Sequence, residues 1–314
     1  MRFSFCHPVI AALLAIAVSI SLSSHAQAQS AAAYMVTDSQ SGHVFLSSNP
    51  HRKLQIGSLT KIATAIVVLD WLSLGHGDSS QLATVPQEAA ALVGSNPIGL
   101  QPGDAMSVRD LLYAAMMQSD NVAALTLAHH VGRTLESASE RSTPITRFVA
   151  QMNALARQLG MKDTLFVNPH GLDTNERKLP FSSATDMARL AAWAMAKPAF
   201  RFYVSQNERQ IAIQRTGVEP TAYLLKNTNE LLGVDAIDGV KTGTTRRAGE
   251  CVIISAARAP ESRQVGENKY EITPRRLIVV ALGANARFQI AASLLREGWA
   301  AYDKWAAQGK PAGR

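Results

Sequence analysis

Apolar and polar positions divide this chain of 314 residues into two ends that favour strands and a middle that favours helices. Near the start, AAYMVTD and HVFLSS are strand candidates on either side of the turn SQSG, a pattern typical of a β-hairpin. Strand candidates return after residue 201 as RQIAIQ, GVKTGT, ECVIISAAR and RRLIVVALG, and a closing helix is expected from Asn285 to about Ala307.

The helical middle is marked by start and stop signals. One helix is expected to begin at Ser58 and to end near Leu72, before the glycines of GHGD. From residue 81 to about 197 the pattern is mainly helical, with a Ser107 cap before VRDLLYAAMM and a capping box from Ser183 to Asp186. The order predicts an α+β domain with a mainly helical insertion at about 75–197. The polar stretches GRTLESASERST and APESRQVGENKYEITP are expected to be a surface loop and an exposed linker.

The N-terminus has the organisation of a secretory signal peptide. Arg2 precedes the apolar run 9–22, and Ala26-Gln27-Ala28 follows as a small-x-small cleavage site. A spanning anchor needs about 20 apolar residues, more than this run contains. We therefore expect residues 1–28 to be a signal peptide cleaved near Ala28, and residues 29–314 to be a single catalytic domain outside the cytoplasmic membrane. Cys251 alone would remain, which excludes an internal disulfide.

Composition narrows the function only slightly. With 47% hydrophobic and 18% charged residues, the chain has an ordinary globular balance. Its net charge of +7 comes from scattered basic residues, with none of the aromatic interleaving that single-strand binders use. We therefore expect no nucleic-acid partner. No cluster has metal-ligand spacing, so no metal or other cofactor is expected.

The first chemical motif is S-x-x-K, formed by Ser58 and Lys61 at the start of a helix. Residues i and i+3 of a helix lie within side-chain reach. A serine there lies near free backbone N–H groups, and a lysine among apolar neighbours would be desolvated and available as a neutral base. Alone, the pattern is weak, because a capping serine followed by a lysine that extends to solvent would look the same.

Two further motifs follow, and each has an ordinary explanation when taken alone. Ser119-Asp120-Asn121 lies between two helices, where such residues are common caps and turn formers. Lys241-Thr242-Gly243-Thr244 lies on a strand, where glycine marks a bulge or a close approach of another chain segment. S-x-x-K, S-D-N and K-T-G in this order are, however, the signature of penicillin-binding proteins and class A β-lactamases.

The likeness extends beyond the motifs. SVRDLLYAAMMQSDNVAA, LGMKDTLFVNPHGLD, KNTNELLG and DAIDGVKTGTTRRAGECVIISA closely resemble the serine D-alanyl-D-alanine carboxypeptidases and endopeptidases, the low-molecular-mass penicillin-binding proteins. The resemblance covers about residues 32–301. It implies a transpeptidase/β-lactamase-like fold, an antiparallel sheet flanked by helices plus a helical subdomain. It also implies peptidoglycan stem peptides as substrates and β-lactam antibiotics as covalent inhibitors.

The same resemblance implies a role for each motif residue. Ser58 would be the nucleophile that forms an acyl-enzyme, Lys61 would take its proton, and Ser119 would relay a proton to the leaving amine. Asn121 would support Ser119 and bind the substrate backbone. The implied strand residues are Lys241 and Thr242, which would hold the substrate carboxylate, Gly243, which would let the substrate lie along the strand, and Thr244, whose N–H would join that of Ser58 in an oxyanion hole.

The resemblance leaves the reaction open between close alternatives. We expect a carboxypeptidase that trims stem peptides. Some carboxypeptidases of this family, however, carry an arginine near NTN, where this chain has Thr228, and short members include D,D-endopeptidases that cut cross-links. A class A β-lactamase is disfavoured, because VAQMNALARQLG lacks the deacylating carboxylate. A silent peptidoglycan-binding protein is disfavoured by the intact motifs.

Beyond the motifs, the tail AAQGKPAGR offers no apolar face, and no C-terminal β-domain or membrane anchor is expected. We therefore expect at most loose association with the membrane. His170 is expected only to shape the rim of the site, and no role is expected for Cys251.

Overall fold

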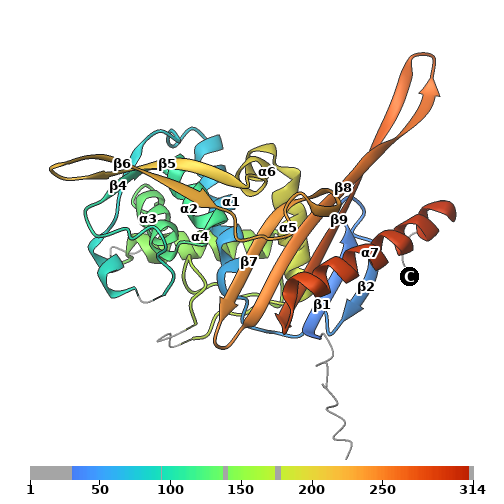
Figure 1. The fold of residues 1–314 in the computed structure, drawn as a ribbon, viewed down its shortest axis with the longest axis horizontal. Helices are drawn as coiled ribbons and strands as arrows, with labels where there is room; N and C mark the ends of the chain where they lie inside the picture. The colour runs from blue at the N-terminus through green and yellow to red at the C-terminus, as the bar shows by residue number, and fades with distance from the viewer. Residues whose placement is uncertain (1–29, 93, 137–140, 174–177, 311–314) are drawn as a thin grey trace, which may run out of the picture.

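The computed structural model describes residues 30–92, 94–136, 141–173 and 178–310. Within these residues a five-stranded antiparallel sheet lies beside a mainly helical unit (Figure 1). The α+β class and the antiparallel sheet flanked by helices are thereby confirmed. The expected signal peptide 1–28 lies outside the described residues, as do residues 137–140 of the predicted surface loop.

The five-stranded sheet joins both ends of the chain. The predicted N-terminal hairpin is present, and its first strand also pairs antiparallel with the last strand of the chain. In spatial order the strands are β2 (Val44–Ser48), β1 (Ala31–Asp38), β9 (Lys269–Ala284), β8 (Gly249–Gly266) and β7 (Ile237–Thr245). The strand that carries the K-T-G motif, β7, is therefore an edge strand, and its free edge is available to a neighbour or a ligand.

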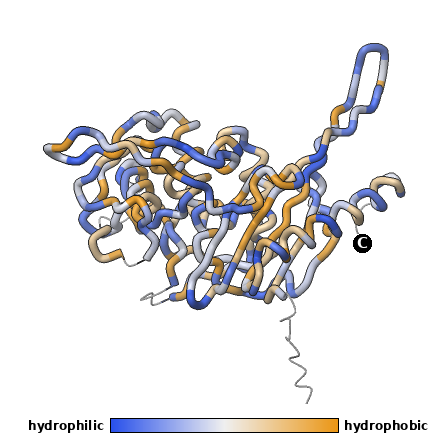
Figure 2. The backbone as a smooth tube through the Cα atoms, in the orientation of Figure 1, coloured by the Kyte–Doolittle hydropathy of each residue, from blue (hydrophilic) through white to orange (hydrophobic). Residues whose placement is uncertain are grey.

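Helices cover both faces of this sheet. In the part of β9 that reads RRLIVVALG, Ile278 and Val280 belong to the core on the side of α5 (Ala184–Ala196), whereas Leu277 and Val279 face α7 (Arg287–Ala307). Successive strand residues point to opposite faces, so a strand covered on both sides has a continuous apolar sequence. The hydrophobic colouring of these strands in Figure 2 shows this pattern.

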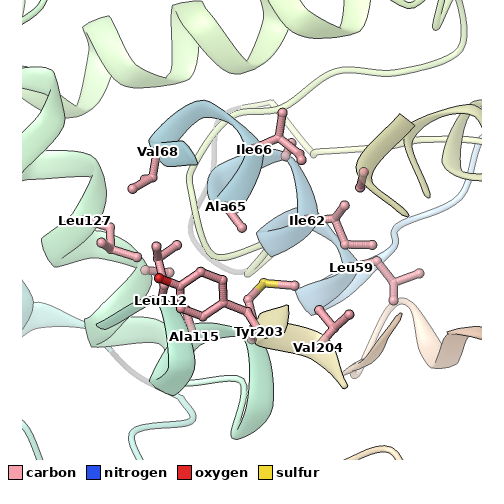
Figure 3. Packing of buried hydrophobic residues seen from close by; sticks show 14 of the residues in the cluster. Leu59, Ile62, Ala65, Ile66, Val68, Leu112, Ala115, Leu127, Tyr203 and Val204 are labelled. Carbon is pink, nitrogen blue, oxygen red and sulfur yellow. The ribbon is translucent and has the colours of Figure 1, made fainter. Parts of the chain in front are cut away.

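The helical unit is built around α1 (Lys61–Ser73). Its residues Ile62, Ala65 and Ile66 are buried and pack against the surrounding helices, with Leu112 and Tyr203 among their neighbours (Figure 3). The other helical elements are η1 (Gly57–Thr60), η2 (Gln87–Ala91), α2 (Val108–Met117), α3 (Asn121–Gly132), α4 (Pro144–Gln158), α6 (Pro198–Val204) and η3 (Val234–Ala236). This packing encloses α1, and so it buries the lysine at its first position.

Side-chain caps set the beginning of several helices. Ser107 and Ser183 accept hydrogen bonds from the backbone N–H groups three residues later, as predicted. Asp120 does the same for α3, and Thr143 for α4. A cap is a local feature, which explains why these boundaries are readable from sequence.

Two regions differ from the predicted elements. The span 81–197 also contains two short strands of a second antiparallel sheet. Each has only three residues, too few to show the apolar alternation that predicts a strand. The strands of this second sheet, in spatial order, are β3 (Leu82–Thr84), β4 (Ala105–Ser107), β5 (Glu208–Arg215) and β6 (Val218–Lys226). The β6 strand was not predicted; it contains Pro220, which disfavours a strand, and in the structure β6 is an edge strand, where a proline is tolerated.

The expected linker APESRQVGENKYEITP is instead a continuation of β8 and β9. The two strands extend beyond the sheet as a two-stranded arm, residues 257–276, which projects from the molecule (Figure 1). Its exposure agrees with the prediction, but its secondary structure does not. An arm exposed on both faces lacks the apolar alternation that reveals a strand.

Candidate active site

Ser58 lies in a 3₁₀ turn, η1, immediately before α1. The regular helix thus begins at Lys61, one turn later than predicted, and Ser58 remains next to its start. The neighbours Ile56 and Leu59 are buried at 1% and 0% exposure, which holds the turn in the core while Ser58 stays partly exposed. The arrangement presents one hydroxyl from an otherwise buried turn.

Lys61 is completely buried and has three polar partners. Its Nζ lies 2.9 Å from Ser58 Oγ, 2.6 Å from Asn121 Oδ1 and 2.9 Å from the backbone oxygen of His170. Burial lowers the pKa of Lys61 to about 7, and the nearby charge of Asp120 limits the decrease. A substantial fraction of Lys61 is therefore neutral near pH 7.

The types of these partners determine what a neutral Lys61 can do. A carbonyl oxygen only accepts hydrogen bonds, so Asn121 Oδ1 and His170 O take both N–H donors of a neutral amine. The lone pair then faces the third partner, the hydroxyl of Ser58, which can donate to it at 2.9 Å. This is the geometry of a general base in contact with its nucleophile.

The second motif connects α2 with α3. Ser119 has a φ of +63°, a left-handed conformation that is uncommon outside glycine. Asp120 accepts a hydrogen bond from Ala123 N at 2.8 Å, so it caps α3 and places Asn121 in the first turn beside Lys61. Among the described residues, the Ser119 hydroxyl makes no hydrogen bond, so its role as a relay stays a prediction.

The third motif lies on β7, on the other side of the Ser58 turn. Lys241 is 1% exposed and donates to the backbone oxygen of Thr242 at 3.0 Å. Burial, the charge of Lys61 and the charge of Arg287 together lower the pKa of Lys241 well below its usual value. Thr242 Oγ1 lies 2.7 Å from Thr228 Oγ1, so these two hydroxyls are paired at the strand.

Gly243 is the point of contact between the strand and the turn. A Cβ atom on Gly243 would lie 2.8 Å from Ile56 O and 3.1 Å from the backbone nitrogens of Ser58 and Leu59. Only a residue without a side chain allows this approach, which agrees with the predicted meaning of a glycine inside a strand. Thr244 N is likewise only 3.2 Å from a Cβ built on Gly57. The backbones of Ser58 and Thr244, the two predicted oxyanion-hole donors, therefore lie on adjoining segments.

Several residues of this site have no signal in the sequence. His170 was expected to shape the rim, but it is 7% exposed, and its backbone oxygen orients Lys61. Burial and the charge of Lys61 lower the pKa of the His170 imidazole to about 3, and its Nδ1 accepts from Leu172 N at 3.2 Å. The ring is therefore neutral and its Nδ1 already accepts a hydrogen bond, so the His170 side chain is a poor candidate for a general base. Gly171 permits the approach, since a Cβ there would lie 1.9 Å from Gly57 O.

Asp120 and Arg287 were also not assigned roles from sequence. Burial raises the pKa of the Asp120 carboxyl, against the effects of backbone N–H groups and Lys61. Arg287, at the start of α7, donates to Thr244 Oγ1 at 2.8 Å. Thus the carboxylate of Asp120 limits the decrease in the pKa of Lys61, and the guanidinium of Arg287 hydrogen-bonds to the C-terminal end of β7. Within the described residues no group of three His, Cys, Asp or Glu residues could hold a metal ion.

Comparison with known sequences gives consistent matches. A family model described as D-alanyl-D-alanine carboxypeptidase, Peptidase_S11, matches residues 20–265. The D-alanyl-D-alanine carboxypeptidase DacC of Escherichia coli is 32% identical over 277 residues, which are 86% of this chain and 61% of that protein. The D-alanyl-D-alanine endopeptidase of Pseudomonas aeruginosa is 30% identical over 236 residues, 72% of this chain and 66% of that protein. The chain thus spans somewhat over half the length of these curated relatives.

Solved structures match over more of their length. The Streptomyces K15 DD-transpeptidase superimposes with a TM-score of 0.71 at 25% identity, covering 86% of this chain and 97% of that one. Penicillin-binding protein D2 from Listeria monocytogenes, in its ampicillin-bound form, gives a TM-score of 0.65 at 27% identity, again covering 86% and 97%. The predicted transpeptidase-like fold is confirmed by these matches.

Proposed function

The chain belongs to the D-alanyl-D-alanine carboxypeptidase family, and on that premise we propose that it is a serine-type D-alanyl-D-alanine carboxypeptidase acting on peptidoglycan stem peptides. One observation carries the proposal. Lys61 Nζ lies 2.9 Å from Ser58 Oγ, while both of its other partners are carbonyl oxygens. The pair therefore has a donor hydroxyl facing an available lone pair, as covalent catalysis requires.

The reaction follows from this geometry. The Ser58 hydroxyl proton passes to Lys61 Nζ as Oγ bonds to the carbonyl carbon of the penultimate D-alanine. The N–H groups of Ser58 and Thr244 stabilise the oxyanion, each donor contributing about 3 kcal/mol. The C–N bond then breaks, and the leaving amine receives the proton from Lys61 through Ser119. Water hydrolyses the ester, its proton passes through Lys61 to Ser58 Oγ, and the acid product leaves.

The substrate-binding part of the proposal concerns β7. Asn121 would bind the substrate backbone, and Lys241 and Thr242 would hold its terminal carboxylate. Because a penicillin carries a comparable carboxylate next to a reactive amide, we propose that β-lactams acylate Ser58 as covalent inhibitors. The ampicillin-bound relative supports this extension.

Labelling with a fluorescent penicillin tests the nucleophile. We expect the wild-type protein to be labelled and Ser58→Ala to show no label. Ser58→Ala removes one oxygen from a turn whose neighbours provide the packing, so its melting temperature should match wild type within a few degrees. A label that survives this substitution would show that the acyl-enzyme forms on a residue other than Ser58.

The endopeptidase reaction is a second candidate, because Thr228 places a hydroxyl near the NTN segment, where some carboxypeptidases of this family carry an arginine. Thr228 is paired with Thr242, and Lys241 is fully buried. Digestion of purified muropeptides separates the two: monomers lose a terminal D-alanine, or cross-linked dimers split. Turnover of nitrocefin should be slow in either case, since the segment 149–160 carries no carboxylate.

We also propose that the protein works in the periplasm after cleavage near Ala28, with at most loose membrane association. The support is the charged, apolar and small-residue order of the first 28 residues. In the described part of the chain, no helix has the length and hydropathy needed to cross a bilayer. N-terminal sequencing of the exported protein, together with a high-salt wash of membranes, tests both statements.

A further inference from the structure

The turn between β7 and β8 carries two adjacent arginines that the reaction above does not use. Arg246 and Arg247 directly follow the strand of the K-T-G motif, and both are exposed. Neither forms an ion pair within the described residues. Arg287 lies nearby, because its guanidinium contacts Thr244 Oγ1 at 2.8 Å. We call Arg246, Arg247 and Arg287 the arginine rim.

The turn that carries the rim is held in a fixed position. Thr245 Oγ1 accepts from Ala248 N at 2.9 Å, and the same hydroxyl donates to the carboxylate of Asp173. Glu250 Oε2 accepts from Arg287 N at 3.1 Å. Among the described residues, the carboxylates of Asp173 and Glu250 are thus engaged in hydrogen bonds that hold this part of the backbone.

The direction of the substrate along β7 decides which part of it meets the rim. The proposed carboxylate-holding residues, Lys241 and Thr242, precede the point where Gly243 and Thr244 meet the Ser58 turn. The leaving D-alanine therefore lies toward Lys241, and the acyl-donor part of the peptide extends toward Thr245. Arg246 opens the turn that follows Thr245, one residue beyond the end of β7. An arginine side chain at this position is long enough to reach the part of the peptide that extends past Thr245.

We infer that the arginine rim binds a carboxylate on the acyl-donor part of the substrate, upstream of the scissile bond. The inference rests on the proposed function, because it takes the direction of the peptide from the acylation of Ser58. It adds a substrate preference: peptides with an acidic group on the acyl side should react faster than neutral ones. Guanidinium groups suit this role because they bind carboxylates through two parallel N–H groups.

Two penicillins that differ by one carboxylate on the acyl side chain provide the test. Benzylpenicillin and α-carboxybenzylpenicillin share the ring carboxylate on the leaving side. Their second-order acylation rates would be measured by competition with fluorescent penicillin on the full chain. The variant Arg246→Gln/Arg247→Gln should lower the ratio of the α-carboxy rate to the benzyl rate about fivefold, with the benzylpenicillin rate within twofold of wild type. The double Lys variant at these positions should retain most of the wild-type ratio.

A matched variant controls for the loss of two positive charges. Arg263→Gln/Lys269→Gln removes two charges from the distant arm and should leave the ratio unchanged. An unchanged ratio in the Arg246/Arg247 variant, or an equal decrease in the arm variant, overturns the inference. Failure of the proposed function is distinguishable, because neither penicillin would then react with Ser58 in any variant.

Discussion

The two sides of the active site each bury a lysine, and the difference between their surroundings is informative. On the helical side, Lys61 has three polar partners. Burial lowers its pKa to about 7, and the nearby carboxylate of Asp120 limits this decrease. On the strand side, Lys241 Nζ donates to the backbone oxygen of Thr242 and to no other described residue, and its charged neighbours Lys61 and Arg287 are positive. The pKa of Lys61 is thus lowered to about 7, whereas the pKa of Lys241 is lowered by burial and by positive neighbours together.

This contrast separates the two proposed roles. A base must exchange a proton at the working pH, and the surroundings of Lys61 favour that. Lys241, by contrast, pairs with no carboxylate among the described residues, and the carboxylate of a bound substrate would supply an opposite charge. Binding of the anion would then raise the pKa of Lys241 and favour its protonated form.

The strongest way to break the comparison is to remove each lysine in turn. We expect Lys61→Ala to lower the acylation rate by about 10³-fold, because general-base assistance is lost. Lys241→Ala should cost about 10-fold to 100-fold, mostly as weaker binding of anionic substrates. Rates of penicillin acylation measure both effects.

A folding control is needed for that pair, since both side chains are fully buried. Lys61→Met keeps most of the side-chain volume, and we expect it to melt close to wild type while still failing to acylate. An unfolded Lys61→Met, or normal acylation by either Lys61 variant, would return Lys61 to a purely structural role.

The next largest effect should come from Gly243, where the two sides touch. In Gly243→Ala the new Cβ would lie 2.8 Å from Ile56 O and 3.1 Å from Ser58 N, so the turn and strand must move apart. A shift of this kind displaces the nucleophile from the oxyanion donors, and we expect acylation to fall about 10²-fold. Gly266→Ala, at the end of the arm, serves as a control with the same chemical change, because its new Cβ would meet only Lys269 side-chain atoms at 3.7 and 3.8 Å. Equal acylation rates for the two variants would contradict the proposed contact.

A smaller effect sharpens the role of Asp120. The base must be neutral, so the acylation rate should rise with pH through about 7 and level off above it. Because the Asp120 charge raises the pKa of Lys61, Asp120→Asn should move this limb to lower pH, and asparagine can still cap α3. A pH profile of benzylpenicillin acylation checks the direction. Movement of the limb to higher pH would show that another group controls it.

Much of the fold was readable from local signals. The caps at Ser107 and Ser183 and the continuous apolar run of β9 are decided by interactions within a few residues. The arm was not predicted as strand because its sequence lacks such local signals. Its residues 257–276 pair with one another and contribute to neither buried core, so they carry no apolar periodicity.

The sequence by itself determined the motif residues, their order and the elements that carry them, because residue type and helical or strand periodicity are local properties. Only the tertiary structure decided how they meet. It places the carbonyl of His170 on an amine 109 residues earlier in the chain, and Gly243 against the backbone of Ser58. A backbone oxygen is present in every residue, so no sequence pattern can select the one that orients Lys61. That selection comes from packing, which also buries Lys61 and so makes its basicity useful.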